Sequence, residues 1–113
     1  MKMTEINRQA KFCIGQVVKH RIYPFRGVIF DVDPTFNNTE EWWESIPEDV
    51  RPKKDQPFYH LLAENAETTY EAYVSEQNLL VDDTGEPIRH PDVDDLFGAL
   101  KDGFYEPKMH QAH

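Results

Sequence analysis

The chain lacks the features that mark secreted and membrane proteins. It has 113 residues and a single cysteine, Cys13, so no disulfide can form within it. No apolar run approaches the ~20 residues that a membrane-spanning helix needs. The first eleven residues lack the apolar segment of a signal peptide. These absences predict a cytoplasmic protein with no membrane partner.

Motifs for phosphates, metals and catalysis are also missing. The five glycines are isolated, so none belongs to a glycine-rich phosphate loop. No CxxC or HExxH spacing fixes a metal, and the weak candidates are His90 with Asp92 and the pair His110 and His113. Cys13 has no base spaced to activate it and is interpreted as a small buried thiol. We therefore predict no cofactor, no metal site, no catalytic residue and no enzymatic activity.

Charge is divided unevenly along a chain whose net charge is −9. Residues 1–30 carry six Lys and Arg against one acid, and residues 31–113 carry six against twenty acids. Such a division creates regions of opposite potential that select and orient partners. Because phosphate contacts need Lys and Arg, nucleic acid would have to bind at the N-terminal basic part.

Alternating apolar and polar residues predict five short strands. Their ranges are 14–20, 27–33, 58–65, 68–75 and 79–81. The third range is apolar on both faces, which indicates a central strand, and it forms an antiparallel hairpin with the fourth. The proline-rich connection at 34–57, where Thr39 can cap one or two helical turns, is expected to be functional or mobile.

A helical period follows the strands, because Val93, Leu96, Phe97 and Leu100 lie at i, i+3, i+4 and i+7. Asp92 would cap this C-terminal helix and Gly103 would end it. Closure removes exposed strand edges, so we predict a mainly β fold: a small SH3-like antiparallel β-barrel of about five strands with one C-terminal helix. The expected organisation is a flexible arm at 1–11, one domain at 12–104 and a flexible tail at 105–113.

A basic, aromatic turn between the first two strands, together with Lys11 of the predicted arm, supplies the candidate DNA-binding residues. They are Lys11, Lys19, His20, Arg21, Tyr23 and Arg26. Cations and flat rings on one loop suit phosphates and exposed bases. The alternative is a solvated loop whose cations pair with the acidic remainder of the surface.

Two adjacent tryptophans in the long connection supply a second candidate surface. Together with the apolar stripe of the predicted helix, the protein-interface candidates are Trp42, Trp43, Leu96, Phe97 and Leu100. Adjacent indoles cannot both face inward in a strand, so at least one is expected at the surface or an interface. The alternative is that Trp42 folds back and caps the core.

Asp31 and Asp33 project from the same face of the second predicted strand and could form a pair of acid and base. A solvated strand face that ends at Pro34 explains them more simply. A hydrolase of this kind would hold both carboxylates inside a deep cleft.

Three motifs in order carry a family resemblance: IGQVVKHRIYPFRGVIFDVDP, QPFYHLLAE and YEAYVSEQNLL. They resemble the heat shock protein HspQ family, also described as the hemimethylated DNA-binding or YccV-like domain, over roughly residues 12–81. The positions that carry the likeness are Gly15, Val18, His20, Gly27, Val28, Asp31, Asp33, Pro34, Tyr59, His60, Tyr73 and Leu79. The resemblance implies a small β-barrel that self-associates, binds hemimethylated DNA and acts on the ATP-dependent protease Lon as a specificity-enhancing factor and substrate.

We therefore predict a non-enzymatic regulatory protein of the stress response, with Lon and hemimethylated DNA as partners by resemblance. Self-association into a homo-oligomer such as a trimer is expected. The alternative is a chromosome- or transcription-associated DNA-binding module that acts through the basic turn from Lys19 to Arg26.

Overall fold

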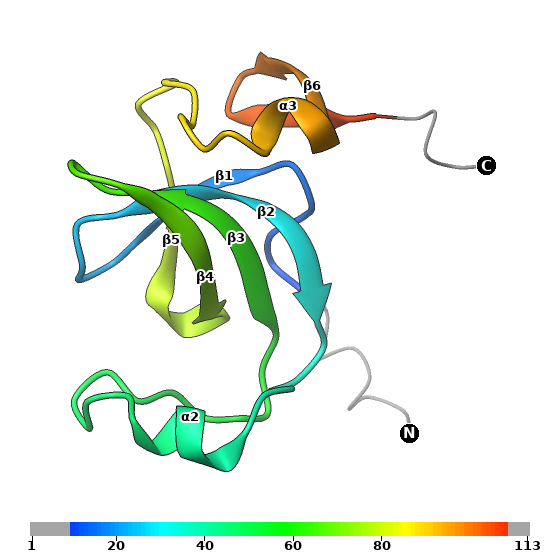
Figure 1. Cartoon of the computed structure of the whole chain (residues 1–113). Helices are drawn as coiled ribbons and strands as arrows, with labels where there is room; N and C mark the ends of the chain where they lie inside the picture. The colour runs from blue at the N-terminus through cyan, green and yellow to red at the C-terminus, as the bar shows by residue number, and fades with distance from the viewer. Residues whose placement is uncertain (1–9, 109–113) are drawn as a thin grey trace, which may run out of the picture.

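The structure is a computed structural model of the chain, in which residues 10–108 are described (Figure 1). Its main element is an antiparallel sheet of five strands in the order β4-β3-β2-β1-β5. The strands are β1 (Val17–His20), β2 (Arg26–Asp33), β3 (Phe58–Glu64), β4 (Thr69–Ser75) and β5 (Leu79–Val81). All five correspond to predicted strands, and the mainly β, antiparallel fold is confirmed. Most of the predicted arm and the end of the predicted tail lie outside the described residues.

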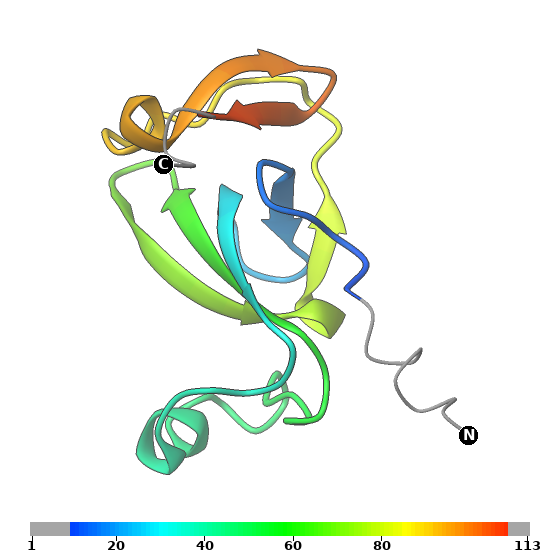
Figure 2. The same ribbon diagram turned by 90° about the vertical axis from the view of Figure 1, so that its right-hand side faces the viewer.

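The sheet curls around a common interior but stays open (Figure 2). β4 and β5 are its two edges, and within residues 10–108 no ladder joins them. The predicted closed barrel is therefore corrected to an open, curled sheet. The short 3-10 helix η1 (Glu76–Asn78) links β4 to β5.

Alternate residues of the central strands face two separate cores. The inner core is enclosed by the curl and comprises Phe12, Val18, Ile29, Tyr59, Leu61, Ala63, Val74 and Leu79. The outer core lies on the other face and comprises Val17, Val28, Leu62, Ile88, Val93, Phe97 and Tyr105. This two-sided burial explains why residues 58–65 are apolar on both faces.

The predicted C-terminal helix is wrong beyond its first turn. The helix α3 spans only Val93–Leu96, and the chain then forms a hairpin of β6 (Phe97–Lys101) and β7 (Phe104–Pro107). Asp102 and Gly103, with φ of 54° and 85°, form the two-residue turn that an Asp-Gly pair favours. A helix of eight residues is marginal in water, whereas this hairpin buries Phe97 and Tyr105 on the sheet. The predicted domain boundary at residue 104 consequently falls inside β7.

The long connection between β2 and β3 is a packed loop around α2 (Glu40–Glu44). The predicted cap is confirmed, because the Trp42 N–H donates to Thr39 Oγ1 at 3.1 Å. Trp43 Nε1 donates to the Pro52 carbonyl at 2.9 Å, which ties the two halves of the loop together. No helix within residues 10–108 has the length and apolar content to cross a bilayer.

Candidate functional site

Arg26, one of the cations of the predicted basic turn, is neutralised by carboxylates of the same chain. Arg26 forms two hydrogen bonds to the Asp82 carboxylate, at 3.0 and 3.1 Å, and one to Glu64 at 2.8 Å. Its remaining N–H groups donate to Thr84 Oγ1 and to the carbonyls of Pro87 and Glu86. Every donor of this guanidinium has a partner, so Arg26 is corrected from a DNA-binding candidate to a structural residue.

The two carboxylates around Arg26 are held in their ionised forms. Burial opposes ionisation of both, but hydrogen bonds from the Arg89 N–H and from Arg26 keep the pKa of Glu64 below its usual value. At Asp82 burial again acts against ionisation, and the hydrogen bonds from Arg26 and Thr84 lower the pKa. The cluster is therefore a buried ion network that joins β2, β3 and the segment after β5.

His20 accepts hydrogen bonds in the turn and does not add a positive charge to those of Lys19 and Arg21. Its Nδ1 accepts the N–H groups of Ile22 and Tyr23, both at 3.0 Å. Burial, and then the charge of Arg21, lower the pKa of His20. The imidazole is accordingly neutral near pH 7 and fixes the conformation of the turn.

The remaining candidates of the basic turn are spread over two sides of it. Lys19 is half-buried and lines a shallow hollow together with Glu64 and Asp82. Arg21 is exposed and donates from Nε to Asn78 Oδ1 at 3.0 Å, while the Lys11 N–H donates to Glu76 Oε2 at 2.8 Å. Lys11 and Arg21 thus both lie beside η1.

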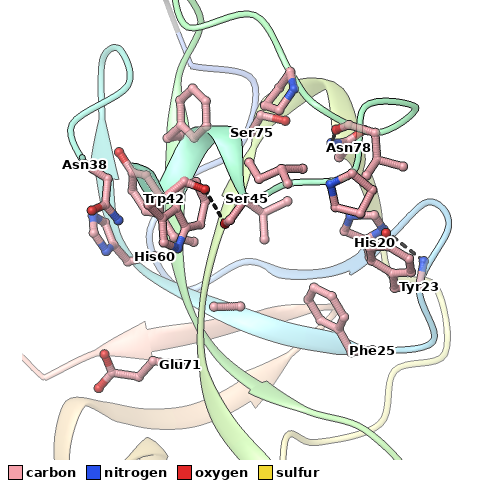
Figure 3. Close-up of a pocket in the computed structure, with 18 of the residues that line it drawn as sticks. His20, Tyr23, Phe25, Asn38, Trp42, Ser45, His60, Glu71, Ser75 and Asn78 are labelled. Carbon is pink, nitrogen blue, oxygen red and sulfur yellow. Dashed lines mark hydrogen bonds between the residues drawn. The ribbon is translucent and has the colours of Figure 1, made fainter. Parts of the chain in front are cut away.

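Tyr23 borders the same shallow hollow as Lys19 and also lines a cavity of about 530 Å³ beside the edge strand β4. We call this cavity the aromatic groove. The end of β1 and the turn that follows it contribute His20, Tyr23 and Phe25. The strand β3 contributes Phe58 and His60, and η1 contributes Asn78. The edge strand β4 contributes all six residues from 70 to 75: Tyr70, Glu71, Ala72, Tyr73, Val74 and Ser75. The connection contributes Asn38, Trp42, Ser45, Ile46, Pro47, Val50 and Pro52. Figure 3 shows Trp42 and His60 at one end and His20, Tyr23 and Phe25 at the other.

Ring contacts fix both ends of the aromatic groove. At one end His20 stacks on Tyr23 with centroids 4.8 Å apart, and Phe25 meets Tyr70 edge-on at 5.8 Å. At the other end Trp42 meets Tyr73 edge-on at 5.4 Å. Edge-to-face and offset pairs of this kind are favourable and leave aromatic surface for a ligand.

The floor of the aromatic groove contains a buried hydroxyl without a partner. Ser75 is 2% exposed, and its Oγ has no hydrogen-bond partner within the described residues. The neighbouring Asn78 is satisfied, since its Nδ2 donates to the Val50 carbonyl at 3.1 Å and its Oδ1 accepts from Arg21. A buried polar atom without a partner is costly and uncommon in native proteins, and an ordered water or a polar group of a ligand commonly supplies the missing bond.

The two tryptophans have different roles. Trp42 lines the aromatic groove and is half-buried. Trp43 stabilises the connection through its bond to Pro52 and lies beneath the cations of Arg51 and Lys54, which are 5.0 and 4.5 Å from its ring centroid. Only Trp42 is placed to contact a ligand in the groove.

The other interface candidates belong to the outer core. Phe97 is 3% exposed, and Leu96 and Leu100 are partly buried against the same core. The prediction of an exposed apolar stripe is therefore corrected, because the stripe covers β2 and β3.

Asp31 and Asp33 do not share a deep cleft. Asp31 is exposed and accepts the Val32 N–H at 2.9 Å, after a bulge in β2 that shifts the register. Asp33 is paired with His60 Nε2 at 3.0 Å and with the Tyr73 hydroxyl at 2.9 Å. Burial, and the bond to Asp33, raise the pKa of Tyr73 to about 12, so its hydroxyl remains a donor. The ligand atoms of Asp31, Asp33 and His60 lie within 4.8 Å of one another, but these internal bonds account for the cluster.

Cys13 differs from its sequence interpretation. The thiol belongs to an exposed residue, although the Cys13 N–H is held by Gln16 Oε1 at 3.1 Å. The expected burial of the thiol is therefore wrong, because Cys13 lies at the start of a turn at Ile14 and Gly15, which the Gln16 N–H closes by donating to the Cys13 carbonyl at 3.1 Å.

Comparison with known proteins assigns the chain to a family. The profile of the family described as "Hemimethylated DNA-binding protein YccV like" matches residues 10–103. The chain belongs to the YccV-like family. The match covers the whole open sheet, α3 and β6, so the YccV-like unit includes the hairpin strand that our sequence prediction made helical.

Curated relatives place the same YccV-like unit within longer proteins. The chain is 32% identical over 108 residues to mouse F-box only protein 21, and 31% identical over 108 residues to the human protein of that name. These alignments cover 95% of this chain and 17% of each relative. The chain therefore spans about a sixth of the length of the curated relatives that it matches.

Sequence reasoning did not identify most of the aromatic groove. The alternating pattern of residues 68–75 predicts a strand, but it does not mark Tyr70, Ala72 or Ser75 as residues that contact a ligand. The signal that could identify these residues is the topology of the sheet. The strand β5 follows β4 and η1 in the chain but lies at the opposite edge, which leaves β4 as an edge strand. An edge strand presents unpaired backbone groups to a ligand, which a central strand does not.

Proposed function

We propose that this protein is a non-enzymatic regulatory module that binds a segment of a partner protein in the aromatic groove. The observation that carries the proposal is the groove itself, with rings at both ends and the unpartnered Ser75 hydroxyl at its floor. Ligand sites are commonly concave, mostly apolar and supplied with a few polar groups that orient the ligand. The neutralisation of Arg26 further favours a protein over a polyanion.

The resemblance to the HspQ family implies that the partner system is protein degradation by the protease Lon in the cytoplasm. We propose this as the setting in which the groove acts. The test is a degradation assay with purified Lon and a model substrate, titrated with the wild-type chain and with Trp42→Ala. We expect the wild-type chain to change the rate of cleavage and the variant to lose at least half of the effect.

A matched control separates the groove from the fold. Trp43→Phe changes the neighbouring ring, which contacts Arg51 and Lys54 outside the groove, and should retain the effect on Lon. A cleavage rate that is unchanged by the wild-type chain over a wide titration would remove Lon as the partner. An effect equal in wild type and Trp42→Ala would remove the groove as the contact.

Hemimethylated DNA is a second candidate ligand, favoured by the description of the family. The structure offers one small cationic surface for it around η1, where Lys11, Arg21 and Lys53 are exposed. All three contact η1: the Lys11 N–H binds Glu76, Arg21 binds Gln77 and Asn78, and the Lys53 N–H binds Gln77 Oε1. This surface replaces the predicted one at Lys19 and Arg26.

Three phosphate contacts give a logarithmic salt slope of about 3, so DNA affinity should fall steeply with salt. We expect Ala at Lys11, Arg21 and Lys53 together to abolish retention of a hemimethylated duplex at low salt. Lys101→Ala, at an exposed cation of β6, is the control and should bind normally. Equal retention by the triple variant and the control would remove this candidate.

Self-association is also proposed, since the edge strand β5 exposes two apolar side chains. Leu80 and Val81 are 46% and 55% exposed. Light scattering after size exclusion measures the mass directly, and Val81→Lys should lower it if β5 is the contact.

A further inference from the structure

The open edge of β4 adds a backbone recognition element to the aromatic groove. We infer that the groove binds an extended segment of a partner protein as an additional strand, paired with β4. This inference rests on the proposed function and specifies the form of the ligand. Pairing with a free sheet edge supplies main-chain hydrogen bonds, while pockets for alternate side chains supply specificity.

The hydrogen bonds of the β3–β4 hairpin show which backbone groups are free. The Asn65 N–H donates to the Thr68 carbonyl at 3.0 Å at one end, and the Glu76 N–H donates to the Pro57 carbonyl at 2.9 Å at the other. In an antiparallel pair, residues that bond across the ladder alternate with residues that do not. Given the register between β3 and β4, the backbone groups of Glu71 and Tyr73 must point away from β3.

These outward groups have no backbone partner within residues 10–108. β4 is the edge of the sheet, and neither Glu71 nor Tyr73 takes part in a backbone hydrogen bond outside the strand ladders. A long, unpaired and unprotected edge is a template for another strand. β4 contains no proline and no lysine, two of the residues that commonly block such pairing.

The aromatic groove runs along this edge and not along one face of β4. It contacts every residue from 70 to 75. Successive side chains of a strand point to opposite faces, so a cavity that contacts six consecutive residues must pass along the edge between them. The groove and the free backbone groups of Glu71 and Tyr73 therefore belong to one site.

Side-chain recognition would come from the two ends and the floor of the groove. A strand lying beside β4 places alternate side chains toward the inner core side, where Phe25 and Tyr70 provide apolar surface. The side chains between them point toward the Tyr73 side, where Trp42 provides it. Ser75, buried at the floor, can bond to a polar group of the incoming chain. An apolar or aromatic anchor with a neighbouring polar residue is therefore expected in the ligand.

The acidic residues around the aromatic groove determine which residues are favoured on either side of the anchor in the ligand. Glu71 lines the groove and is exposed, and the exposed Glu44 and Glu48 adjoin its lining residues Ser45 and Pro47. The chain as a whole carries a net charge of −9. Basic residues flanking the anchor would thus be favoured. A second copy of this chain is disfavoured as the occupant, because pairing two β4 edges would bring their Glu71 carboxylates together.

The test uses twelve-residue peptides selected from a random display library against the full chain. We expect an apolar or aromatic anchor flanked by Lys or Arg, and binding that is lost in Trp42→Ala. Each backbone amide of a selected peptide is then N-methylated in turn. Strand addition predicts that methylation weakens binding about tenfold or more at alternate positions and has little effect between them, since only every second N–H faces β4.

A pair of variants tests the protein side. Glu71→Pro removes an outward N–H without removing a bond to β3, and proline is tolerated at such positions of edge strands. Glu71→Thr removes the same carboxylate and keeps the N–H. We expect Glu71→Pro to abolish peptide binding and Glu71→Thr to retain it, with circular dichroism confirming that both variants are folded.

The outcomes separate this inference from the proposed function. Peptides that bind through Trp42 but show no alternation on methylation, or selected peptides that are rich in proline, would overturn strand addition and leave the groove as the protein-binding site. Failure to select any peptide dependent on Trp42 would remove the groove and the inference together. Because methylation changes only the peptide, the test holds even if Glu71→Pro does not fold.

Discussion

At the scale of single residues, Arg26 shows how a sequence motif can serve structure in place of binding. Its side chain is 18% exposed, and the carboxylates of Glu64 and Asp82 are 10% and 3% exposed. A buried pair of charges is costly to break, because removing one partner leaves the other charge uncompensated. The basic turn therefore depends on Arg26 for its attachment to the segment after β5.

We predict that Arg26→Ala lowers the free energy of unfolding by about 3 kcal/mol, because Glu64 and Asp82 remain buried without their common partner. Arg89→Ala is the control: the Arg89 side chain also bonds to Glu64, but it is 58% exposed and should cost about 1 kcal/mol or less. Urea unfolding followed by fluorescence measures both. Equal losses in the two variants would contradict the central role of Arg26.

Replacing Ser75 with Ala is expected to affect stability and ligand binding in opposite directions. Because its Oγ is buried without a partner, Ser75→Ala should leave the free energy of unfolding unchanged or raise it by up to about 1 kcal/mol. The same change should weaken binding of a groove peptide, which loses its acceptor or donor. Ser45→Ala is the contrast, since Ser45 Oγ donates to the Trp42 carbonyl at 2.6 Å and its loss should destabilise α2. Thermal unfolding and peptide titration distinguish the two variants.

His20 makes the turn sensitive to acid. Its pKa in the folded chain is below the ordinary value of 6.5, because of burial and then the charge of Arg21. The unfolded chain therefore binds a proton first as pH falls, and the stabilisation is complete above 6.5 and is lost as pH falls through the folded pKa. We expect urea midpoints to fall between pH 7 and pH 5.5 in the wild type. The fall should be smaller in His20→Gln, and an equal fall in both would contradict this role.

At the scale of elements, the β6–β7 hairpin is the part of the fold that the sequence pattern misrepresented. The spacing of Val93, Leu96, Phe97 and Leu100 satisfies a helical period over two turns. The chain forms a hairpin instead of a helix, because the hairpin buries Phe97 and Tyr105 against the outer face of the sheet. The Asp102–Gly103 pair was the local signal for a hairpin, and interpreting Gly103 as the end of a helix concealed it.

The hairpin also depends on a single close approach at Gly15. This residue has φ of 94°, and its carbonyl accepts the Tyr105 N–H at 2.7 Å. A Cβ at Gly15 would lie 2.3 Å from the Tyr105 carbonyl oxygen. The N-terminal segment and β7 can therefore pack together only around glycine.

We predict that Gly15→Ala costs at least about 2 kcal/mol, from strain at a positive φ and from displacement of β7. Gly85→Ala is the matched control, because Gly85 has φ of 76° but no atom within 4 Å of the added Cβ. It should cost about 1 kcal/mol. Hydrogen exchange at Tyr105 should accelerate in the first variant only. Equal destabilisation would show that backbone strain alone accounts for the effect.

At the scale of the whole molecule, local patterns predicted the strands well and their spatial partners poorly. The period of two in residues 27–33 and the apolar faces of residues 58–65 fixed β2 and β3, because side-chain alternation is a local property. The aromatic groove depends on residues far apart in sequence, such as Tyr23, Trp42 and Ser75, which only the curl of the sheet brings together. The pairing of Arg26 with Asp82 is equally non-local, so charge counting could not decide between a free arginine and one paired with the acidic surface.

The pairing of β1 with β5 has a consequence for when the protein can act. Strands β1 to β4 pair with their neighbours along the chain, whereas β5 must return to the far edge, where Leu80 pairs with Lys19. Contacts of such large sequence separation form late and slowly. Arg21 and Asn78, of which Asn78 lines the aromatic groove, meet only when this return is complete. During its synthesis, or after a cut between β4 and β5, the chain would hold most of its sheet and still lack the complete groove that we propose as its binding site.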